Sequence, residues 1–356
     1  MLIFFTVIGV LLLIVVHELG HFLTAKYFGM RVDEFGIGIP PRAWGKKWGE
    51  TLYSLNWLPF GGFVRIRGED KEPEDMKELN ESEKSRLFMF QSAWKKALVI
   101  AAGVIINLLM GWILFAMVFA IGTPTLIYIQ EVQEESPAAK AGLVEGDVVT
   151  GYGLAQEIVS SENISADEFV QFIDSRDGGE MQLKVLRGTD EMFFTLSPRV
   201  KPPEGEGALG VGFTEIGFVA KPIGESIWLG ALRVGEVFKL TLIGLGSLLS
   251  GLFTAGEVPE GIVGPVGIFS FVYKSAQIGL VYLLQILGLI SINLAVLNMI
   301  PFPALDGGQL AFILLEKIKG SPLKTSTKAI VNASGIAFLL LLVLIVSVRD
   351  VWIIFS

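Results

Sequence analysis

The chain has 356 residues, of which 52% are hydrophobic and only 18% are charged, a balance far more apolar than that of soluble domains and typical of a membrane protein. Its formal net charge of -8 offers no basic surface of the kind that attracts nucleic acid, so nucleic acid is excluded as a partner. The chain has no cysteine, which excludes disulfides, thiolate ligands and a cysteine nucleophile. Any metal must therefore be held by nitrogen and oxygen.

Four apolar stretches are long enough to cross a bilayer, which takes about 20 helical residues. They cover residues 2–28, 97–121, 278–300 and 329–348. The first stretch lacks the basic start and the small-residue cleavage site of a signal peptide, so we expect it to remain in the mature protein. A fifth stretch, residues 230–253, carries Arg233, Glu236 and Lys239, and we expect it to be a helix on the outer membrane surface.

The basic residues near these stretches predict their orientation, because cytoplasmic loops are enriched in lysine and arginine. They follow the first stretch, precede the second and lie between the third and the fourth: Lys26, Arg31, Arg42, Lys46, Lys47, Lys95, Lys96, Lys317, Lys319, Lys324 and Lys328. The loops 29–96 and 313–328 are therefore predicted to be cytoplasmic. Residues 122–137 contain no lysine or arginine, which places them, and both termini, on the opposite side.

Two different patterns share the first loop. The sequence PFGGFVRIRG, residues 59–68, turns on a glycine pair and then alternates apolar and basic residues, which predicts a strand. Such a strand forms either an ordinary hairpin or an edge that is offered to a peptide. Residues 65–86 are rich in charges of both signs without apolar periodicity, which favours a solvated linker.

Residues 122–215 are typical of an inserted α+β domain. The short runs IYIQEV, MQLKVLR and MFFTLSP predict strands, and residues 165–174 predict a helix. The sequence SPAAKAGLVEGDVV, residues 136–149, predicts a short helix that ends at Gly142 before a turn and a strand. This stretch resembles the corresponding part of PDZ domains in bacterial proteases, which bind peptide ends or add a strand to their sheet. A PDZ-like fold without a ligand remains an alternative, and residues 216–277 connect the domain to the third span.

The sequence HELGH in the first span predicts a metal site. His17 and His21 are four residues apart and share one face of a helix, so both can bind one metal ion, while Glu18 lies beside them as a candidate general base. Zinc in such sites takes three protein ligands and leaves a fourth position for water. An incidental charge inside a membrane costs about 2.5–3.5 kcal/mol on insertion scales, and these are the only two histidines in the chain. We therefore interpret them as zinc ligands.

The third ligand is predicted to be Asp306, in the sequence NMIPFPALDGG. Its prolines interrupt the third span and its glycines leave the backbone free to turn, so we expect Asp306 on non-helical chain at membrane depth. The first and third spans run in the same direction, and all three ligands then reach the cytoplasmic half of the bilayer. This agreement requires that residues 230–253 do not cross the membrane.

With these motifs, the chain resembles the site-2 protease family of intramembrane zinc metalloproteases, and within it the bacterial regulator-of-sigma-E type (RseP). The resemblance also covers PFGGFVRIRGED, AAGVIINLLMG, GIVGPVGI and EKIKG. The sequence departs from the family where Val104 follows Gly103 in place of proline, while Asn107 is kept. Only one PDZ-like domain is recognisable, whereas the sigma-E type usually carries two.

The resemblance implies a polytopic α-helical fold with four transmembrane helices, a membrane re-entrant β-hairpin and an extracytoplasmic PDZ-like domain. It implies that His17, His21 and Asp306 bind zinc and that Glu18 is the catalytic base. It further implies that Asn298 and the hairpin residues bind the substrate backbone; the latter are Gly61, Gly62, Phe63 and Val64. A bacterial inner membrane is the implied location.

The function that we expect is cleavage of single-span membrane proteins within or near the bilayer, for example anti-sigma factors or the remnants of signal peptides. Membrane lipid and these substrates are the expected partners. A membrane zinc transporter would also place histidine and aspartate in the membrane, but it would not require Glu18. A catalytically silent scaffold that uses its PDZ-like domain would tolerate the loss of Glu18.

Overall fold

The computed structural model divides the chain into two compact units, residues 1–117 with 224–356 and residues 118–223. It describes residues 2–69, 79–154, 157–159, 163–187, 190–203, 206–254, 267–268, 272 and 279–355. Most of the motif GIVGPVGI, at residues 261–266, lies outside these ranges, as do residues 70–78 of the predicted linker. Each unit is described separately below.

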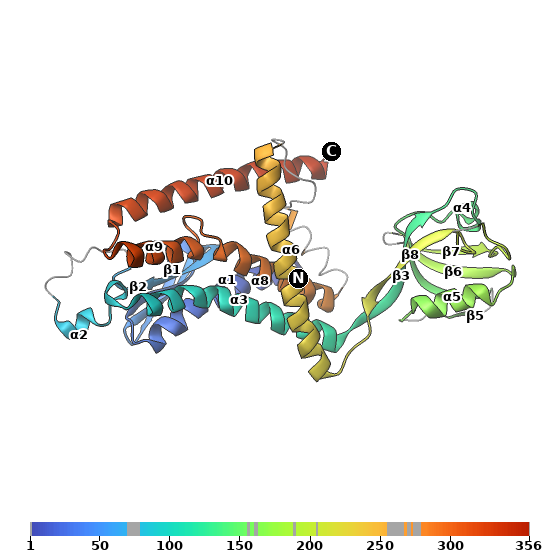
Figure 1. The fold of residues 1–356 in the computed structure, drawn as a ribbon. Coiled ribbons are helices and arrows are strands. Elements are labelled where there is room, and N and C mark those ends of the chain that lie inside the picture. Colours follow the sequence, from blue (N-terminus) through green and yellow to red (C-terminus); the bar gives the residue numbers. More distant parts are fainter. Residues whose placement is uncertain are drawn as a thin grey trace. The chain divides into compact units, whose positions relative to one another are not determined.

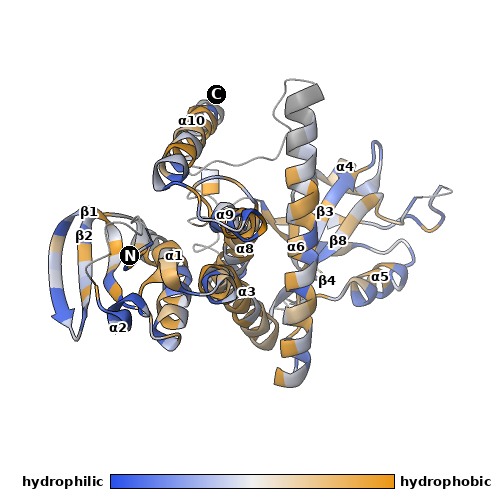
Figure 2. Ribbon diagram, turned by 60° about the vertical axis from the view of Figure 1, so that its left-hand side comes forward, coloured by the Kyte–Doolittle hydropathy of each residue, from blue (hydrophilic) through white to orange (hydrophobic). Residues whose placement is uncertain are grey.

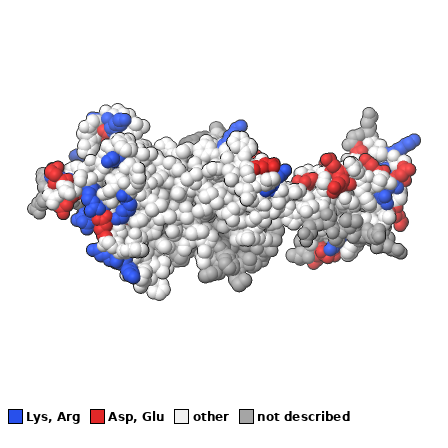
Figure 3. Space-filling model, turned by 90° about the horizontal axis from the view of Figure 1, so that it is seen from below, with Lys and Arg blue, Asp and Glu red and all other residues white. Residues whose placement is uncertain are grey.

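Among its described residues, the first unit contains four helices that are long and apolar enough to cross a membrane, within residues 8–27, 93–121, 280–299 and 325–349. These helices are α1 (Leu2–Tyr27), α3 (Ala93–Ile121), α8 (Leu280–Met299) and α10 (Thr325–Phe355). Figure 2 colours α3 and α10 largely as hydrophobic. In Figure 3, lysine, arginine and acidic residues cluster at one end of this unit, and a broad surface without charged residues lies next to them. The prediction of four spans is confirmed.

Helix α6 (Ile223–Thr254) is not among the candidate spans found in the described part of the chain. It crosses the other helices of its unit at a steep angle (Figure 1). The indole of Trp112 on α3 donates a hydrogen bond to the carbonyl oxygen of Ile227 at 2.8 Å, and Thr241 donates one to Asn293 on α8 at 2.6 Å. Polar contacts at two positions along α6 therefore attach this helix to α3 and α8.

A sheet formed by β1 (Val32–Trp48) and β2 (Thr51–Ile66) packs on the ends of α1 and α3. Both strands bend, so that Glu34 opposes Arg65 on one side and Leu52 on the other, while Trp44 opposes Leu55. The sheet therefore has four rows of chain, and residues 61–66 form one outer row. Phe22, Phe35 and Val99 belong to the apolar cluster that holds this sheet against the helices.

A buried carboxylate ties the rows of this sheet together. Glu34 is 5% exposed and accepts hydrogen bonds from Ser54 at 2.7 Å, Arg42 at 3.0 Å and Arg65 at 3.2 Å. These three donors come from the three other rows. Because a buried carboxylate is stable only when its oxygens are paired, Glu34 fixes the position of the outer row that carries Arg65.

The charged linker is more ordered than its composition predicts. Residues Glu81–Lys84 form the short helix α2, and Phe88–Phe90 form the 3-10 helix η2. Asn80 accepts a hydrogen bond from the amide of Glu83 at 2.8 Å, and the Glu83 carboxylate accepts one from the amide of Asn80 at 3.2 Å. This reciprocal capping stabilises a short helix in a segment that lacks apolar periodicity, and no residue of α2 is buried.

The second unit is an antiparallel sheet with two short helices. Its strands are β3 (Thr123–Val132), β4 (Val148–Leu154), β5 (Glu157–Val159), β6 (Met181–Arg187), β7 (Asp190–Leu196) and β8 (Val211–Phe218). The order is β7-β6-β4-β3-β8, and β5 pairs with β4. Helix α4 (Pro137–Ala141) ends at Gly142, which adopts φ 93°, and α5 (Ala166–Asp174) places Phe169 and Ile173 in the core.

One ion pair closes the turn after α4. Asp147 is fully buried and accepts two hydrogen bonds from Arg187 on β6, at 2.7 and 2.9 Å, and one from the amide of Val144 at 3.0 Å. The hydrogen bonds to Asp147 raise the pKa of Arg187 above its ordinary value. This fork of hydrogen bonds fixes the turn that precedes β4.

We predict opposite effects for two glycine substitutions in the helices of the first unit. A Cβ at Gly111 on α3 would lie 2.5 Å from Ile292 Cγ1 and 3.3 Å from the carbonyl oxygen of Gly288 on α8, whereas a Cβ at Gly235 on α6 would meet nothing within 4 Å. Gly111→Ala should lower the free energy of unfolding by about 1–3 kcal/mol through overpacking. Gly235→Ala should raise it by up to about 1 kcal/mol through helix propensity.

Thermal unfolding of the two variants and the wild type in the same detergent measures this difference. Equal melting temperatures for the two variants would contradict the close packing of α3 on α8.

Candidate metal centre

Three potential ligands from distant parts of the sequence meet in the first unit. His17 and His21 lie one turn apart on α1, and Asp306 is the first residue of α9 (Asp306–Lys319). The two Nε2 atoms are 3.2 Å apart, and Asp306 Oδ2 lies 3.1 Å from Nε2 of His17 and 3.4 Å from Nε2 of His21. The structure thus brings Asp306 to the two histidines, and the three ligand atoms form a compact triangle of two nitrogens and one oxygen.

The triangle has the size and chemistry of a zinc site. Zinc binds histidine nitrogen and carboxylate oxygen at about 2.0–2.2 Å with tetrahedral geometry, which separates neighbouring ligand atoms by about 3.3 Å. Asp306 Oδ2 is buried and has no hydrogen-bond donor among the described residues, although buried carboxylate oxygens are normally paired. A cation at the centre of the triangle would satisfy this oxygen, so the residues fit a bound zinc ion.

The surroundings of Asp306 correct one expectation. We expected Asp306 on non-helical chain, but the irregular segment ends at Leu305 and Asp306 begins α9. The glycines that follow are required by close packing: a Cβ at Gly307 would lie 2.1 Å from the carbonyl oxygen of Ile300, and one at Gly308 would lie 2.2 Å from that of Phe302. The helix therefore starts directly against the loop. A carboxylate at this position is also favoured by the helix dipole.

One face of helix α3 contacts the imidazole rings of both histidines. Nδ1 of His21 lies 2.8 Å from the carbonyl oxygen of Val99, to which it donates a hydrogen bond when Nε2 faces the metal. A Cβ at Gly103 would lie 2.5 Å from His21 Nε2 and 2.6 Å from His17 Cε1, so only glycine leaves room for both rings. Asn107, fully buried, places its side chain 3.2 Å from Nδ1 of His17.

Sequence reasoning missed this face of α3, although a signal for it was present. Val99, Gly103 and Asn107 follow one another at intervals of four residues, a spacing that puts them on one side of a helix. That side packs closely on α1, since a Cβ at Gly20 would lie 2.6 Å from the carbonyl oxygen of Ala102. An asparagine one turn after a glycine in an apolar span therefore marks the contact with the metal ligands.

Glu18 lies between the metal ligands and the outer row of the β1–β2 sheet. A Cβ at Gly62 would lie 3.0 Å from Glu18 Cγ and 3.9 Å from Glu18 Cβ, so this glycine lies directly against the Glu18 side chain. The neighbouring Gly61 adopts φ 98° and Phe63 covers Gly36 in the adjacent row. The structure thus brings the predicted hairpin residues, Gly61 to Val64, to the predicted base.

The remaining predicted residue also lies at the centre. Asn298, the penultimate residue of α8, places its amide nitrogen 3.2 Å from Nε2 of His17. Because this Nε2 atom faces the metal position, the Asn298 side chain borders the same space. The irregular segment that connects α8 to α9 begins after Met299, so one short stretch of chain carries both Asn298 and the ligand Asp306.

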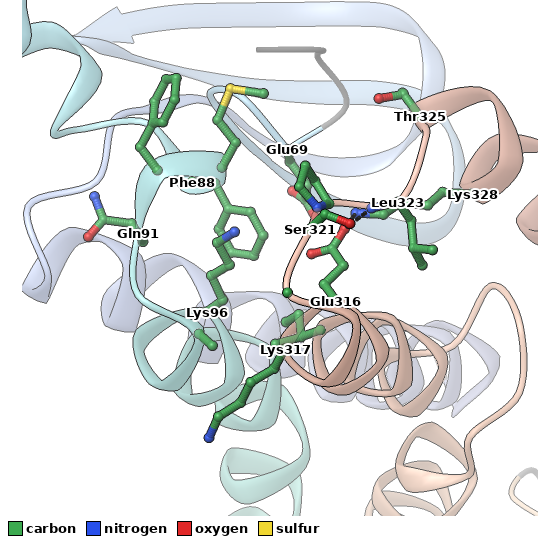
Figure 4. A pocket seen from close by; sticks show the side chains of 16 residues that line it. Glu69, Phe88, Gln91, Lys96, Glu316, Lys317, Ser321, Leu323, Thr325 and Lys328 are labelled. Atoms are coloured by element: carbon green, nitrogen blue, oxygen red, sulfur yellow. Dashed lines mark hydrogen bonds and ion pairs between the residues drawn. The ribbon is translucent and has the colours of Figure 1, made fainter.

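The far end of α9 borders a hollow of about 420 Å³ that contains none of the metal ligands (Figure 4). Here Glu316 accepts hydrogen bonds from Lys328 on α10 at 2.5 Å and from the amide of Leu323 at 3.0 Å. Although burial acts to raise it, these two partners hold the pKa of Glu316 below its ordinary value. The ion pair ties α9 to the start of α10 and thereby fixes the helix whose first residue is Asp306.

The comparisons with known proteins agree with this geometry. Residues 5–342 match the model of peptidase family M50. The chain is 33% identical over 348 residues to a protein of Nostoc sp. (strain PCC 7120) whose description names a zinc metalloprotease, and the match covers 95% of this chain and 92% of that protein. It is 28% identical over 413 residues to the regulator of sigma-W protease RasP of Bacillus subtilis, with 95% of both chains covered.

Among solved structures, the PDZ domain of an SdrC-like protein from Listeria innocua is 22% identical to the matched part, with a TM-score of 0.21. The match covers 25% of this chain and 92% of that domain. The family match extends over both units and includes all three residues of the metal centre. The chain therefore belongs to peptidase family M50 and is a RasP-like intramembrane zinc metalloprotease with four candidate membrane-spanning helices.

Proposed function

We propose that this protease hydrolyses peptide bonds in or near the transmembrane segment of single-span membrane proteins. The observation that carries the proposal is the meeting of His17, His21 and Asp306 with Glu18 beside them, at one end of helices that can span a bilayer. The names of relatives support the same class of substrate, since RasP of Bacillus subtilis is called a regulator of sigma-W protease. Anti-sigma factors and remnants of signal peptides are the substrates that we propose.

In this proposal His17, His21 and Asp306 hold the zinc ion and Glu18 is the general base. Zinc supplies Lewis-acid activation of water and of the scissile carbonyl. The Glu18 carboxylate takes the proton from the attacking water and passes it to the leaving amine. Gly62 lies against the Glu18 side chain, so Glu18 lies between the metal ligands and the strand that would hold the substrate.

Asn298 is proposed to bind the carbonyl group that is attacked. Its amide nitrogen lies 3.2 Å from His17 Nε2, which places a hydrogen-bond donor at the edge of the metal position. A fixed donor aimed at the oxygen that gains negative charge stabilises the transition state of peptide hydrolysis. Asn298 therefore stabilises the charge on the attacked carbonyl oxygen together with the metal, while Glu18 transfers the proton.

The outer row of the β1–β2 sheet is proposed to hold the substrate in an extended form. A transmembrane helix satisfies all its carbonyl groups internally, so it must unwind before water can attack one of them. Residues 61–66 form an outer row of the sheet, next to Glu18. An extended peptide can add to such a row through main-chain hydrogen bonds, which supports Gly61, Gly62, Phe63 and Val64 as substrate-binding residues of a re-entrant hairpin.

The proposal also assigns the loops and the second unit to sides of the membrane. The loops 29–96 and 313–328 are cytoplasmic, and the metal centre lies in the cytoplasmic half of a bacterial inner membrane. The second unit is an extracytoplasmic PDZ-like domain that meets the outer part of the substrate. This arrangement rests on the asymmetric placement of lysine and arginine around the spans.

Glu18→Gln tests the central chemical role. Glutamine keeps the size of the side chain but cannot accept the proton, so we predict a loss of about 10²–10⁴-fold in the cleavage rate of a model single-span substrate. The metal ligands are unchanged, so purified Glu18→Gln should retain the same zinc content as the wild type. Zinc content is measured by atomic absorption on the same samples.

Cleavage at the wild-type rate by Glu18→Gln would overturn the general-base role, and zinc binding without cleavage by either protein would favour a transporter or a scaffold. Loss of zinc in this variant would contradict a role for Glu18 that is separate from metal binding.

A second prediction concerns the sheet row that would hold the substrate. Glu34→Gln removes the charge that Arg42 and Arg65 share while keeping the shape of the side chain, and hydrogen bonds to charged groups contribute about 1.5–3 kcal/mol each. We expect kcat/KM for the model substrate to fall about 10-fold, mainly through KM, with unchanged zinc content. Glu81→Gln on the exposed helix α2 is the matched control and should have no effect.

A Glu34→Gln variant with the kinetic constants of the wild type would show that the outer row does not need this carboxylate.

A further inference from the structure

The side chain of Asn107 touches a metal ligand but has no place in the mechanism above. It lies on α3, is fully buried, and its Nδ2 atom is 3.2 Å from Nδ1 of His17. Its Oδ1 atom is also buried and has no hydrogen-bond donor among the described residues. A buried amide with an unpaired oxygen is costly in an apolar span, so this contact requires an explanation.

The protonation of His17 in the metal-bound state decides how Asn107 must be oriented. When Nε2 of His17 binds a metal, that nitrogen carries no proton and Nδ1 carries one. With Nδ2 of Asn107 toward Nδ1, two hydrogen-bond donors would face each other. A half-turn of the Asn107 amide exchanges its nitrogen and oxygen and gives the oxygen, which otherwise lacks a donor, the N–H group of His17.

We propose that Asn107 is a positioning residue for the metal site, which accepts a hydrogen bond from Nδ1–H of His17 through Oδ1 and so directs Nε2 toward the metal. The inference rests on the proposed role of His17 as a zinc ligand. It gives His17 the same support that His21 receives from the carbonyl oxygen of Val99 at 2.8 Å. Both ligands then have a hydrogen-bond acceptor on α3, on either side of Gly103.

The backbone of Asn107 is itself held in place. Ser291 on α8, fully buried, donates a hydrogen bond to the carbonyl oxygen of Asn107 at 2.8 Å. Partners that orient a metal-binding histidine act through its second nitrogen, and their loss commonly weakens metal binding 10–100-fold. The contact between α3 and α8 therefore supports a metal ligand on α1, three helices acting on one imidazole ring.

Two nearly isosteric substitutions separate this role from packing. Asn107→Asp retains an oxygen that can accept a hydrogen bond from Nδ1–H of His17, whereas Asn107→Leu keeps the branched shape of the side chain but removes the acceptor. We expect Asn107→Leu to bind zinc about 10–100-fold more weakly than the wild type, and Asn107→Asp to bind it at least as tightly. If Asn107 served only packing, leucine would be tolerated best and the buried charge of aspartate would be the more damaging change.

The measurement is zinc affinity of the metal-free, full-length protein in detergent, by competition with a chelator, together with the absorption spectrum of the Co²⁺-substituted forms. A wild-type affinity in Asn107→Leu, or weaker binding by Asn107→Asp than by Asn107→Leu, would overturn the inference. His17→Ala is the control for the site itself: if it binds zinc like the wild type, the proposed metal centre fails, independently of Asn107.

Should Asn107→Asp not fold without metal, Asn107→Leu decides alone. Weaker zinc binding with the metal-free melting temperature of the wild type supports positioning by Asn107, and unchanged zinc binding overturns it.

Discussion

The metal centre depends on the space that a glycine leaves between two helices. Two imidazole rings one turn apart on α1 can converge with Asp306 only because Gly103 on α3 presents no side chain, since a Cβ there would lie 2.5 Å from His21 Nε2. Small residues commonly allow close helix packing in membranes, and here the same property allows a ligand set to form. Gly307 and Gly308 act similarly, because they let α9 begin against the preceding loop and bring its first residue to the two histidines.

From this constraint the other parts of the site follow. Helix α3 contacts the two imidazole rings through Val99, Gly103 and Asn107, and α8 contributes Asn298 near its C-terminal end. On the other side of Glu18, the β1–β2 sheet presents an outer row, whose position is fixed by the buried Glu34 carboxylate. In our proposal, a helical substrate exchanges its internal hydrogen bonds for those of this sheet near the metal ligands, because a carbonyl group inside a helix is not available for attack by water.

Much of this arrangement could be predicted from the sequence, because its signals are local or chemically rare. The four spans follow from length and hydropathy, and His17, Glu18 and His21 from helical spacing inside an apolar run. Asp306 followed from the need for a third ligand at matching depth. The helical start at Asp306 was not predicted, because two consecutive glycines suggest a flexible backbone. In the structure they instead allow close contact with Ile300 and Phe302.

The contacts that the sequence did not reveal are those between segments. The four rows of the β1–β2 sheet depend on bends that pair Glu34 with both Arg65 and Leu52, which strand alternation cannot show. Helix α2 forms through a capping box in a segment whose composition favours disorder. The roles of Val99 and Gly103 become visible only when α1 lies on α3, although their spacing in the sequence was a usable signal.

The most direct test of the account is zinc K-edge X-ray absorption on the purified wild type and on Asp306→Ala. The account predicts one zinc ion per wild-type chain with two imidazole nitrogens and oxygen ligands at about 2.0–2.2 Å, and a loss of zinc from Asp306→Ala at chelator concentrations that leave the wild type loaded. An unchanged spectrum and zinc content in Asp306→Ala would contradict the meeting of α1 and α9 at a single metal ion.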